Sequence, residues 1–206
     1  ILTHGKGAQV WDPDGREYLD YGMGLRAVTL GYANERVNRA AIREIERGVN
    51  LTRASTVELA AAELIVELLP SADMVKFAKN GSNVTTAAVK VARAYTGRKY
   101  VCVPRQHPFF SFDDWFIGAT PITRGVPEGR ADYTLMFDYG DIQSLTALFE
   151  QHGKDIACVM LVPATNIFPC PASCTPARDI ARTCAGCPNR TGNFLHEVRE
   201  LAHGHG

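Results

Sequence analysis

Apolar residues recur at helical spacing in two segments of the first third of the chain. In residues 35–47 they fall every three or four positions, and Gly48 follows as a stop signal. Residues 56–69 repeat the spacing, and Pro70 ends it. The positions expected to face inward are Val37, Ala41, Ile42, Ile45, Leu59, Ala62, Leu64, Ile65, Leu68 and Leu69. The pattern therefore predicts two amphipathic helices that act as scaffold.

The segment before these helices has the pattern of a β-hairpin. Residues 8–11 and 17–21 carry strand-forming side chains, and a turn-forming Asp-Pro-Asp-Gly run separates them at 12–15. Further along, β-rich runs alternate with helical patterns. Strands are expected at 99–103, 133–137 and 156–162, and helices at 141–153 and 194–202.

This alternation predicts an α/β fold, with a mostly parallel sheet, flanking helices and a small N-terminal hairpin. The run at 156–162 is continuously apolar, as in a strand that is buried on both faces. A chain of 206 residues is long enough to bury such a core.

A tight turn joins another apolar run to a helix in the middle of the chain. Residues 74–78 are expected to form a short buried strand, an Asn-Gly turn follows at 80–81, and Ser82 or Asn83 caps the helix. Together with the strand at 99–103 this makes a βαβ unit. A helix N-terminus offers unpaired N–H groups and a positive dipole end, so the junction suits a phosphate-like anion. An ordinary capped helix is the alternative.

The segment after residues 99–103 is rich in aromatic side chains. Five rings fall within residues 107–116. Because ligands bind at the carboxyl ends of parallel strands, we expect this segment to lie near the Asn-Gly turn. A hydrophobic plug under a loop is the other interpretation, and it would account for Phe112, Trp115 and Phe116.

Composition and charge narrow the class of protein. Lys and Arg number 22, Asp and Glu also 22, and no basic stripe stands out, which argues against a nucleic-acid partner. No apolar run reaches the length of a membrane span, and the first residues lack a charged-then-apolar leader. The expectation is a cytoplasmic chain with neither a membrane nor a nucleic acid as partner.

A cysteine-rich segment at 169–191 is a candidate metal site. Cys170, Cys174, Cys184 and Cys187 could bind one structural zinc ion as a closed set of four thiolates. Large apolar side chains are scarce there, so burial alone cannot order the segment. Free thiols, a labile disulfide and an iron–sulfur site are the alternatives. The two other cysteines, Cys102 and Cys158, fall in predicted strands as core residues.

The residues at 80–83, followed by those at 87–98, resemble the class III aminotransferases, and among them the glutamate semialdehyde aminomutases. The similarity runs from Gly7 to the C-terminus, with the cysteine-rich segment as an insertion. It implies the fold of the type I transferases that depend on pyridoxal 5′-phosphate (PLP). It also implies a small-domain segment at 1–50 and part of the PLP-binding large domain at 51–206.

The resemblance implies roles for particular residues. Gly81, Ser82 and Asn83 would hold the PLP phosphate, as the equivalent turn does in the family. Phe109 would stack on the cofactor ring, with Phe110 beside it, in place of the family's Tyr-His-Gly.

The resemblance also implies an activity: amino-group transfer between small-molecule donors and acceptors, as aminotransferase or aminomutase, in a homo-oligomer. Arg26, beside a Gly-Met-Gly-Leu run, could hold a substrate carboxylate. A solvated arginine is the simpler interpretation of that residue.

Two departures qualify this implied activity. The chain has Val162-Pro163 where the family has Glu-Pro. The family's Schiff-base lysine and its pyridinium-pairing aspartate have no counterpart in residues 1–206, so the chain resembles the front part of such an enzyme and no catalytic residue is assigned. The alternative function is a non-catalytic, zinc-stabilised binding or assembly module.

Overall fold

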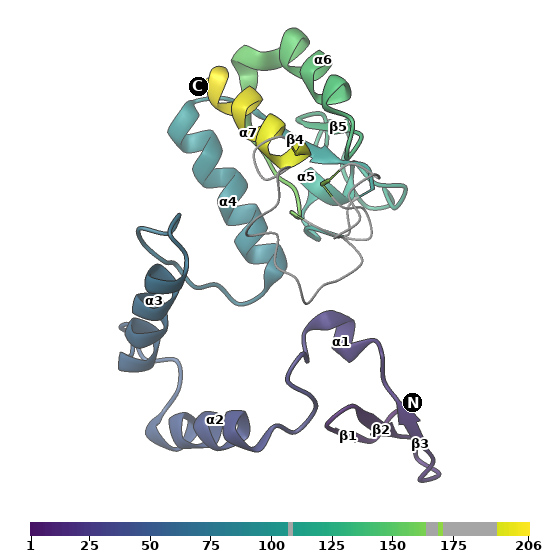
Figure 1. Ribbon diagram of the computed structural model, residues 1–206, viewed down its shortest axis with the longest axis vertical. Helices are drawn as coiled ribbons and strands as arrows, with labels where there is room; N and C mark the ends of the chain where they lie inside the picture. The colour runs from purple at the N-terminus through teal and green to yellow at the C-terminus, as the bar shows by residue number, and fades with distance from the viewer. Residues whose placement is uncertain (107–108, 164–168, 171–192) are drawn as a thin grey trace. The chain divides into compact units, whose positions relative to one another are not determined.

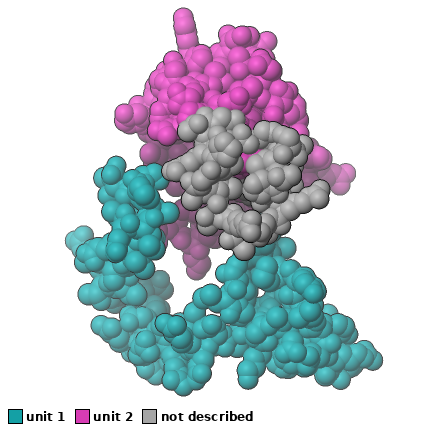
Figure 2. All heavy atoms as spheres, viewed as in Figure 1, with its two compact units in different colours: residues 1–76 teal, residues 77–206 magenta. Residues whose placement is uncertain are grey.

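A computed structural model of the protein describes residues 1–106, 109–163, 169–170 and 193–206. The chain divides into two compact units, residues 1–76 and 77–206 (Figure 2). This division falls later than the boundary at residue 50 suggested by the resemblance, which stays a prediction. Within the described residues, no helix combines the length and the apolarity needed to cross a membrane.

The N-terminal unit begins with a small antiparallel sheet (Figure 1). Strands β1 (His4–Lys6), β2 (Gln9–Trp11) and β3 (Glu17–Leu19) pair in that order. The predicted hairpin is thus confirmed as β2 and β3. Strand β1 was not predicted, because His4-Gly5-Lys6 has no apolar alternation to reveal it.

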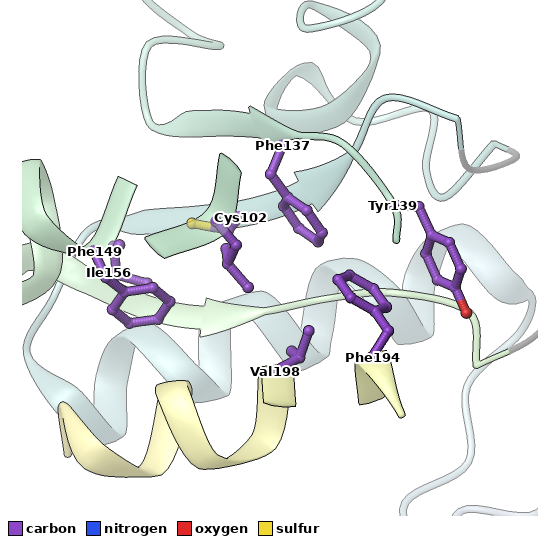
Figure 3. Close-up of a cluster of buried hydrophobic side chains, with 8 residues drawn as sticks. Cys102, Phe137, Tyr139, Phe149, Ile156, Phe194 and Val198 are labelled. Atoms are coloured by element: carbon purple, nitrogen blue, oxygen red, sulfur yellow. The ribbon is translucent and has the colours of Figure 1, made fainter. Parts of the chain in front are cut away.

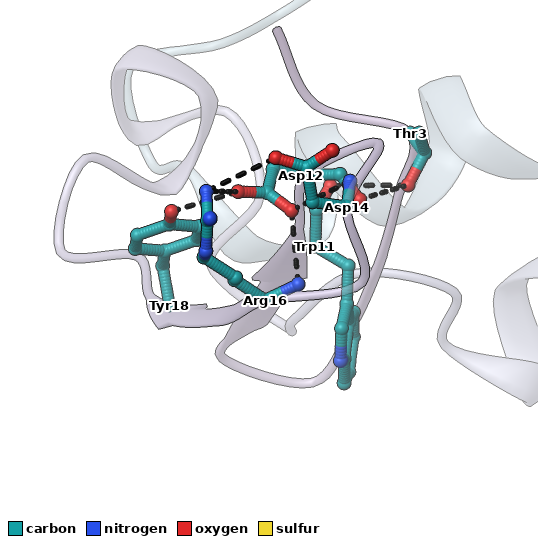
Figure 4. A network of polar contacts seen from close by, with 6 residues as sticks. All are labelled: Thr3, Trp11, Asp12, Asp14, Arg16 and Tyr18. Carbon is teal, nitrogen blue, oxygen red and sulfur yellow. Dashed lines mark hydrogen bonds and ion pairs between the residues drawn. The ribbon is translucent and has the colours of Figure 1, made fainter.

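The turn of this hairpin is held by one carboxylate, as Figure 4 shows. The Asp12 side chain accepts hydrogen bonds from the backbone N–H groups of Asp14 (3.0 Å) and Arg16 (2.9 Å). The Tyr18 hydroxyl donates to its other oxygen at 2.8 Å. Local polar contacts therefore fix the turn without a buried core.

Two amphipathic helices follow, the first with the predicted bounds and the second ending one residue earlier than predicted. Helix α2 (Glu35–Arg47) is capped by Asn34, and helix α3 (Thr56–Leu68) by a capping box of Ser55 and Glu58. The expectation that their apolar stripes face inward is wrong for the described chain, because neither helix has a buried residue. Ile45 and Leu59 are examples of exposed stripe positions.

The C-terminal unit contains the predicted parallel sheet. Strand β4 (Tyr100–Pro104) lies between β5 (Thr134–Phe137) and β6 (Ile156–Val159), and both pairings are parallel. The helices of this unit are α4 (Gly81–Thr96), α5 (Asp114–Ile117), α6 (Ile142–His152) and α7 (Phe194–Gly204), and a 3-10 turn, η1 (Gly153–Asp155), precedes β6.

Alternate residues of β4 supply the cores on the two faces of the sheet. Cys102 points to one face, where it joins a cluster with side chains of α6 and α7, among them Phe149 and Phe194 (Figure 3). Val101 and Val103 point to the other face and pack with Val89 of α4. The unit is therefore a three-layer α/β arrangement, as the alternation of strands and helices predicted.

Two strand predictions need correction. Residues 74–78 form no strand in the described structure, and Met74 is largely exposed. A strand requires a paired neighbour, and none of the described strands pairs with this segment. The run at 156–162 is a strand only as far as Val159, and most of it is half-buried because β6 is an edge of the described sheet.

Candidate functional site

The first turn of α4 presents backbone donors to solvent. Asn80, and not Ser82 or Asn83 as predicted, is the N-cap: its side-chain oxygen accepts from the Asn83 N–H at 3.0 Å. The extended backbone of Asn80 starts the helix at Gly81, earlier than the apolar pattern indicated. Gly81 and Ser82 therefore keep the unpaired N–H groups of a helix start, whereas Asn83 can offer a ligand only its side-chain amide.

The charge around this turn favours an anion. The first turn of α4 holds no acidic side chain, and the exposed Lys79 precedes the cap. The positive end of the helix dipole adds to this field. Gly81 has no heavy atom within 4 Å of the position that a Cβ would take, so the surroundings of its Cα are open. These features together suit a phosphate.

The Ser82 hydroxyl links the turn to the aromatic loop at 109–116. Its oxygen accepts from the Phe112 N–H at 3.3 Å, which leaves the hydroxyl hydrogen available for a ligand oxygen. The Thr85 hydroxyl lies 2.8 Å from the Phe110 carbonyl oxygen and donates to it. The structure thus brings together two predicted site segments that lie 25 or more residues apart in the sequence.

A second pair of hydroxyls makes the same connection deeper in the protein. Thr86 Oγ1 and Ser111 Oγ are 2.9 Å apart, and the Trp115 indole N–H donates to Thr86 Oγ1 at 2.8 Å. Ser111 is fully buried. Thr85, Thr86 and Ser111 were not predicted from the sequence. The one available signal was a cluster of hydroxyl residues in two segments already expected to meet.

The aromatic rings of the loop fall into two groups. Trp115 and Phe116 are buried, as the plug interpretation predicted, and Phe110 is buried with them. Phe112 is 77% exposed, so its assignment to the plug is wrong: its backbone N–H, and not its ring, is directed to the protein. Phe109 is 50% exposed and packs edge-on against Phe112, with ring centroids 4.6 Å apart.

Phe109 also lines an open groove of about 740 Å³ at the carboxyl ends of β4 and β5. Pro104 and Met136 of these strands contribute to its wall, together with Phe116. Of the two phenylalanines considered for ring stacking, Phe109 therefore has a free face and Phe110 does not. This is the end of a parallel sheet at which ligands bind.

Arg26 belongs to the N-terminal unit and ends an unusual turn. Met23, Gly24, Leu25 and Arg26 all have positive φ angles, between 47° and 73°. The turn follows Asp20, whose carboxylate accepts from the Gly22 N–H at 2.8 Å and from the Tyr32 hydroxyl at 2.7 Å. Arg26 is exposed, and a role in binding a carboxylate stays a prediction.

The zinc prediction is not tested by the described residues. Cys170 is half-buried, whereas Cys174, Cys184 and Cys187 lie outside the described residues. In the part of the chain that the structure describes, no group of three or more His, Cys, Asp or Glu side chains is placed to hold a metal ion. Cys102 is a core residue, as predicted, and burial raises the pKa of its thiol to about 12.

Comparison with known proteins identifies the family. The family model of the class-III aminotransferases matches residues 1–152. The chain belongs to this family. The glutamate-1-semialdehyde 2,1-aminomutase of Aquifex aeolicus is 34% identical over 171 residues, which cover 79% of this chain and 40% of that protein. Glutamate-1-semialdehyde 2,1-aminomutase 1 of Bacillus cereus is 36% identical over 178 residues, covering 81% and 41%.

Solved structures of other proteins share the fold. An omega-transaminase from Sphaerobacter thermophilus has a TM-score of 0.82 and 27% identity, covering 100% of this chain and 46% of that one. The FumI protein of Sphingopyxis sp. MTA144, in its PLP internal aldimine form, has a TM-score of 0.74 and 32% identity, covering 79% and 38%. The predicted resemblance and fold class are confirmed, and this class-III chain spans about two fifths of the length of the curated relatives named above.

The donors at the α4 turn fit the phosphate end of PLP, the cofactor that the class-III family implies. They comprise two unpaired backbone N–H groups, one hydroxyl with a free hydrogen and one side-chain amide, without a carboxylate in the turn. A phosphate needs several donors of this kind and no hydrophobic contact. The half-exposed ring of Phe109 offers a face for the aromatic part of the cofactor.

Proposed function

We propose that this chain forms the cofactor-binding front part of a PLP-dependent enzyme of amino-group transfer, either an aminotransferase or an aminomutase. The observation that carries the proposal is the set of hydrogen bonds that ties the first turn of α4 to the aromatic loop. These bonds hold a phosphate site and an aromatic face on one rigid support. Membership in the class-III family supplies the chemistry that such a pair would serve.

Each residue of the site has a distinct task in this proposal. The N–H groups of Gly81 and Ser82 and the Ser82 hydroxyl donate to phosphate oxygens, and the Asn83 amide closes the set. The Phe109 ring lies against the cofactor ring and excludes water from one of its faces. PLP, when bound, supplies an electron sink for the substrate amine. The chain's own residues bind and orient, and none is assigned to proton transfer.

Substrate binding and assembly complete the proposal. Arg26 would pair with the carboxylate of an amino donor or acceptor, because a guanidinium can hold a carboxylate in bidentate fashion.

We also propose a homo-oligomer. The exposed apolar stripes of α2 and α3, with Ile42 and Leu64 among their members, support it because exposed apolar surface favours association. One structural zinc ion bound by Cys170, Cys174, Cys184 and Cys187 remains a further proposal, tested by elemental analysis of the purified protein.

A pair of substitutions at Gly81 tests the phosphate site. Gly81→Pro removes the N–H of the first helical residue, where proline is well accommodated, and Asn80 already has the extended backbone that a following proline requires. Gly81→Ala keeps the N–H and meets no atom within 4 Å. We expect the proline variant to bind pyridoxine 5′-phosphate about tenfold more weakly, since a hydrogen bond to a charged group contributes about 1.5 kcal/mol or more.

The test uses pyridoxine 5′-phosphate as the ligand and Gly81→Ala as the control variant. Pyridoxine 5′-phosphate carries the ring and phosphate but no aldehyde, so it cannot react with the nearby Lys79. The alanine variant should bind within about twofold of the parent chain. Equal binding by the parent chain and the proline variant, measured by calorimetry, would remove Gly81 from the phosphate site.

A further inference from the structure

A chain of hydrogen bonds connects the interior of the aromatic loop with the first turn of α4, which begins at Gly81 and is called the phosphate turn below. The Trp115 indole can only donate, so Thr86 Oγ1 accepts from it at 2.8 Å. Thr86 Oγ1 and Ser111 Oγ lie 2.9 Å apart, where either hydroxyl can be the donor, and Ser111 Oγ lies 3.4 Å from the Ser82 carbonyl oxygen. These contacts connect Trp115 through Thr86 and Ser111 to Ser82.

We propose that Thr86 and Ser111 are positioning residues of the cofactor site. This inference rests on the proposed function and adds two residues that do not touch the ligand. Their hydroxyls would fix the distance and orientation between the phosphate donors of α4 and the ring of Phe109. A ligand that spans both parts would then meet them in a single geometry.

The placement of Ser111 makes it suited to this role. It lies in the sequence between Phe110, whose ring is anchored in the core, and Phe112, whose N–H donates to the Ser82 hydroxyl. Ser111 Oγ also accepts from the Asp113 N–H at 3.0 Å, so its oxygen and its hydrogen are both in use. A fully buried hydroxyl with all its bonding capacity satisfied holds its neighbours more firmly than an apolar contact of the same size.

Thr86 is the corresponding anchor on the helix. It is partly buried in the second turn of α4 and connects that turn to both Ser111 and the Trp115 indole. Trp115 belongs to α5, and its carbonyl accepts from the Thr134 hydroxyl of β5. The phosphate turn is thereby tied to the sheet through side chains as well as through the backbone.

Two phosphate ligands distinguish positioning from general structural support. Inorganic phosphate needs only the donors of α4. Pyridoxine 5′-phosphate needs those donors and the Phe109 ring face at the correct distance and orientation relative to each other. Loss of positioning should therefore weaken the binding of pyridoxine 5′-phosphate and leave the binding of inorganic phosphate unchanged. Damage to the helix start would weaken the binding of both ligands.

The experiment measures both affinities in Ser111→Ala and Thr86→Val by isothermal calorimetry. We expect pyridoxine 5′-phosphate to bind about fivefold more weakly to each variant, the size of one aromatic contact, and phosphate to bind within about twofold of the parent. Thr86→Ser, which keeps the hydroxyl, should restore the affinity. Thr146→Val is the control, because the Thr146 hydroxyl bonds to the Ile142 carbonyl within α6, away from the site.

The outcomes separate the inference from the proposed function. If the parent chain does not bind pyridoxine 5′-phosphate, the proposed function fails and the positioning role with it. If the parent binds and both variants bind equally well, or lose both ligands alike, the positioning role is overturned and the proposed function stands. Should Thr86→Val not fold, Ser111→Ala decides.

An NMR measurement on the unsubstituted chain gives a second test. Pyridoxine 5′-phosphate, but not inorganic phosphate, should shift the signal of the Trp115 indole N–H.

Discussion

The N-terminal and C-terminal units of this chain reach regular structure by different means. Residues 1–76 form their strands and helices with local signals: the Asp12 turn, the Asn34 cap and the Ser55 capping box. Val10 is their one buried hydrophobic residue among those described. Residues 77–206 bury two clusters, one on each face of the parallel sheet. Both units nevertheless carry apolar stripes in their sequences.

The comparison shows what an amphipathic pattern can and cannot predict. The stripes of α2 and α6 both identify a helix with its bounds, because helix formation depends on spacing and caps. Of these two helices, α6 has its stripe covered, because a sheet lies beside it. The first turn of α4, where we propose the phosphate site, also belongs to the unit with a core, which is where a site can be held in a fixed geometry.

The largest expected contrast is a matched pair of leucine substitutions. Leu145→Ala in α6 removes a fully buried side chain and should lower the free energy of unfolding by about 3–5 kcal/mol. Leu64→Ala in α3 changes a side chain that is 52% exposed and should cost about 0.5 kcal/mol or less. Denaturant unfolding of both variants measures the contrast. Equal losses would mean that α3 is covered by other parts of the protein.

The C-terminal unit should also lose stability at high pH. Burial raises the pKa of Cys102 from 9.0 to about 12, so the folded chain keeps this proton when the unfolded chain has lost it. The raised pKa of Cys102 contributes fully to the free energy of unfolding below pH 9.0, and this contribution declines as the pH rises toward 12. Unfolding measured between about pH 8 and 11 should show this decline, and Cys102→Ala should make the slope shallower. An unchanged slope would exclude Cys102 as its source.

The stability of the N-terminal unit should depend on pH at the acidic end of the scale, and more weakly. The Tyr32 hydroxyl and the Gly22 N–H lower the pKa of the Asp20 carboxyl below its ordinary 3.8. The contribution of this contact is present above pH 3.8 and is lost as pH falls through the lowered pKa. NMR titration of the Asp20 carboxyl carbon measures it, and Tyr32→Phe should raise the pKa. If Tyr32→Phe leaves the titration unchanged, the hydroxyl is not the cause.

The sequence predicted local elements well and long-range contacts poorly. Spacing and stop signals defined α2, α3 and α6, and alternation located the hairpin and the parallel strands. The strand at 74–78 failed because a strand exists only with a partner, which spacing does not reveal. Phe112 was misplaced because its aromatic character is visible in the sequence and the direction of its ring is not.

The candidate site was predicted in part. Gly81, Ser82 and Asn83 lie at a helix start, as expected, although Asn80 is the cap. The resemblance pointed to Phe109, and the exposed face of its ring agrees with that choice. The hydroxyls of Thr85, Thr86 and Ser111 could not be predicted because their partners lie 25 or more residues away. No local pattern encodes such pairs.

The central claim is that the first turn of α4 binds the phosphate of the cofactor, and amide NMR of the parent chain tests it directly. Titration with pyridoxine 5′-phosphate should shift the backbone N–H signals of Gly81 and Ser82 most, together with the side-chain amide of Asn83. Saturation should follow a single binding curve. Shifts confined to other residues, with Gly81 and Ser82 unchanged at saturating ligand, would contradict the account.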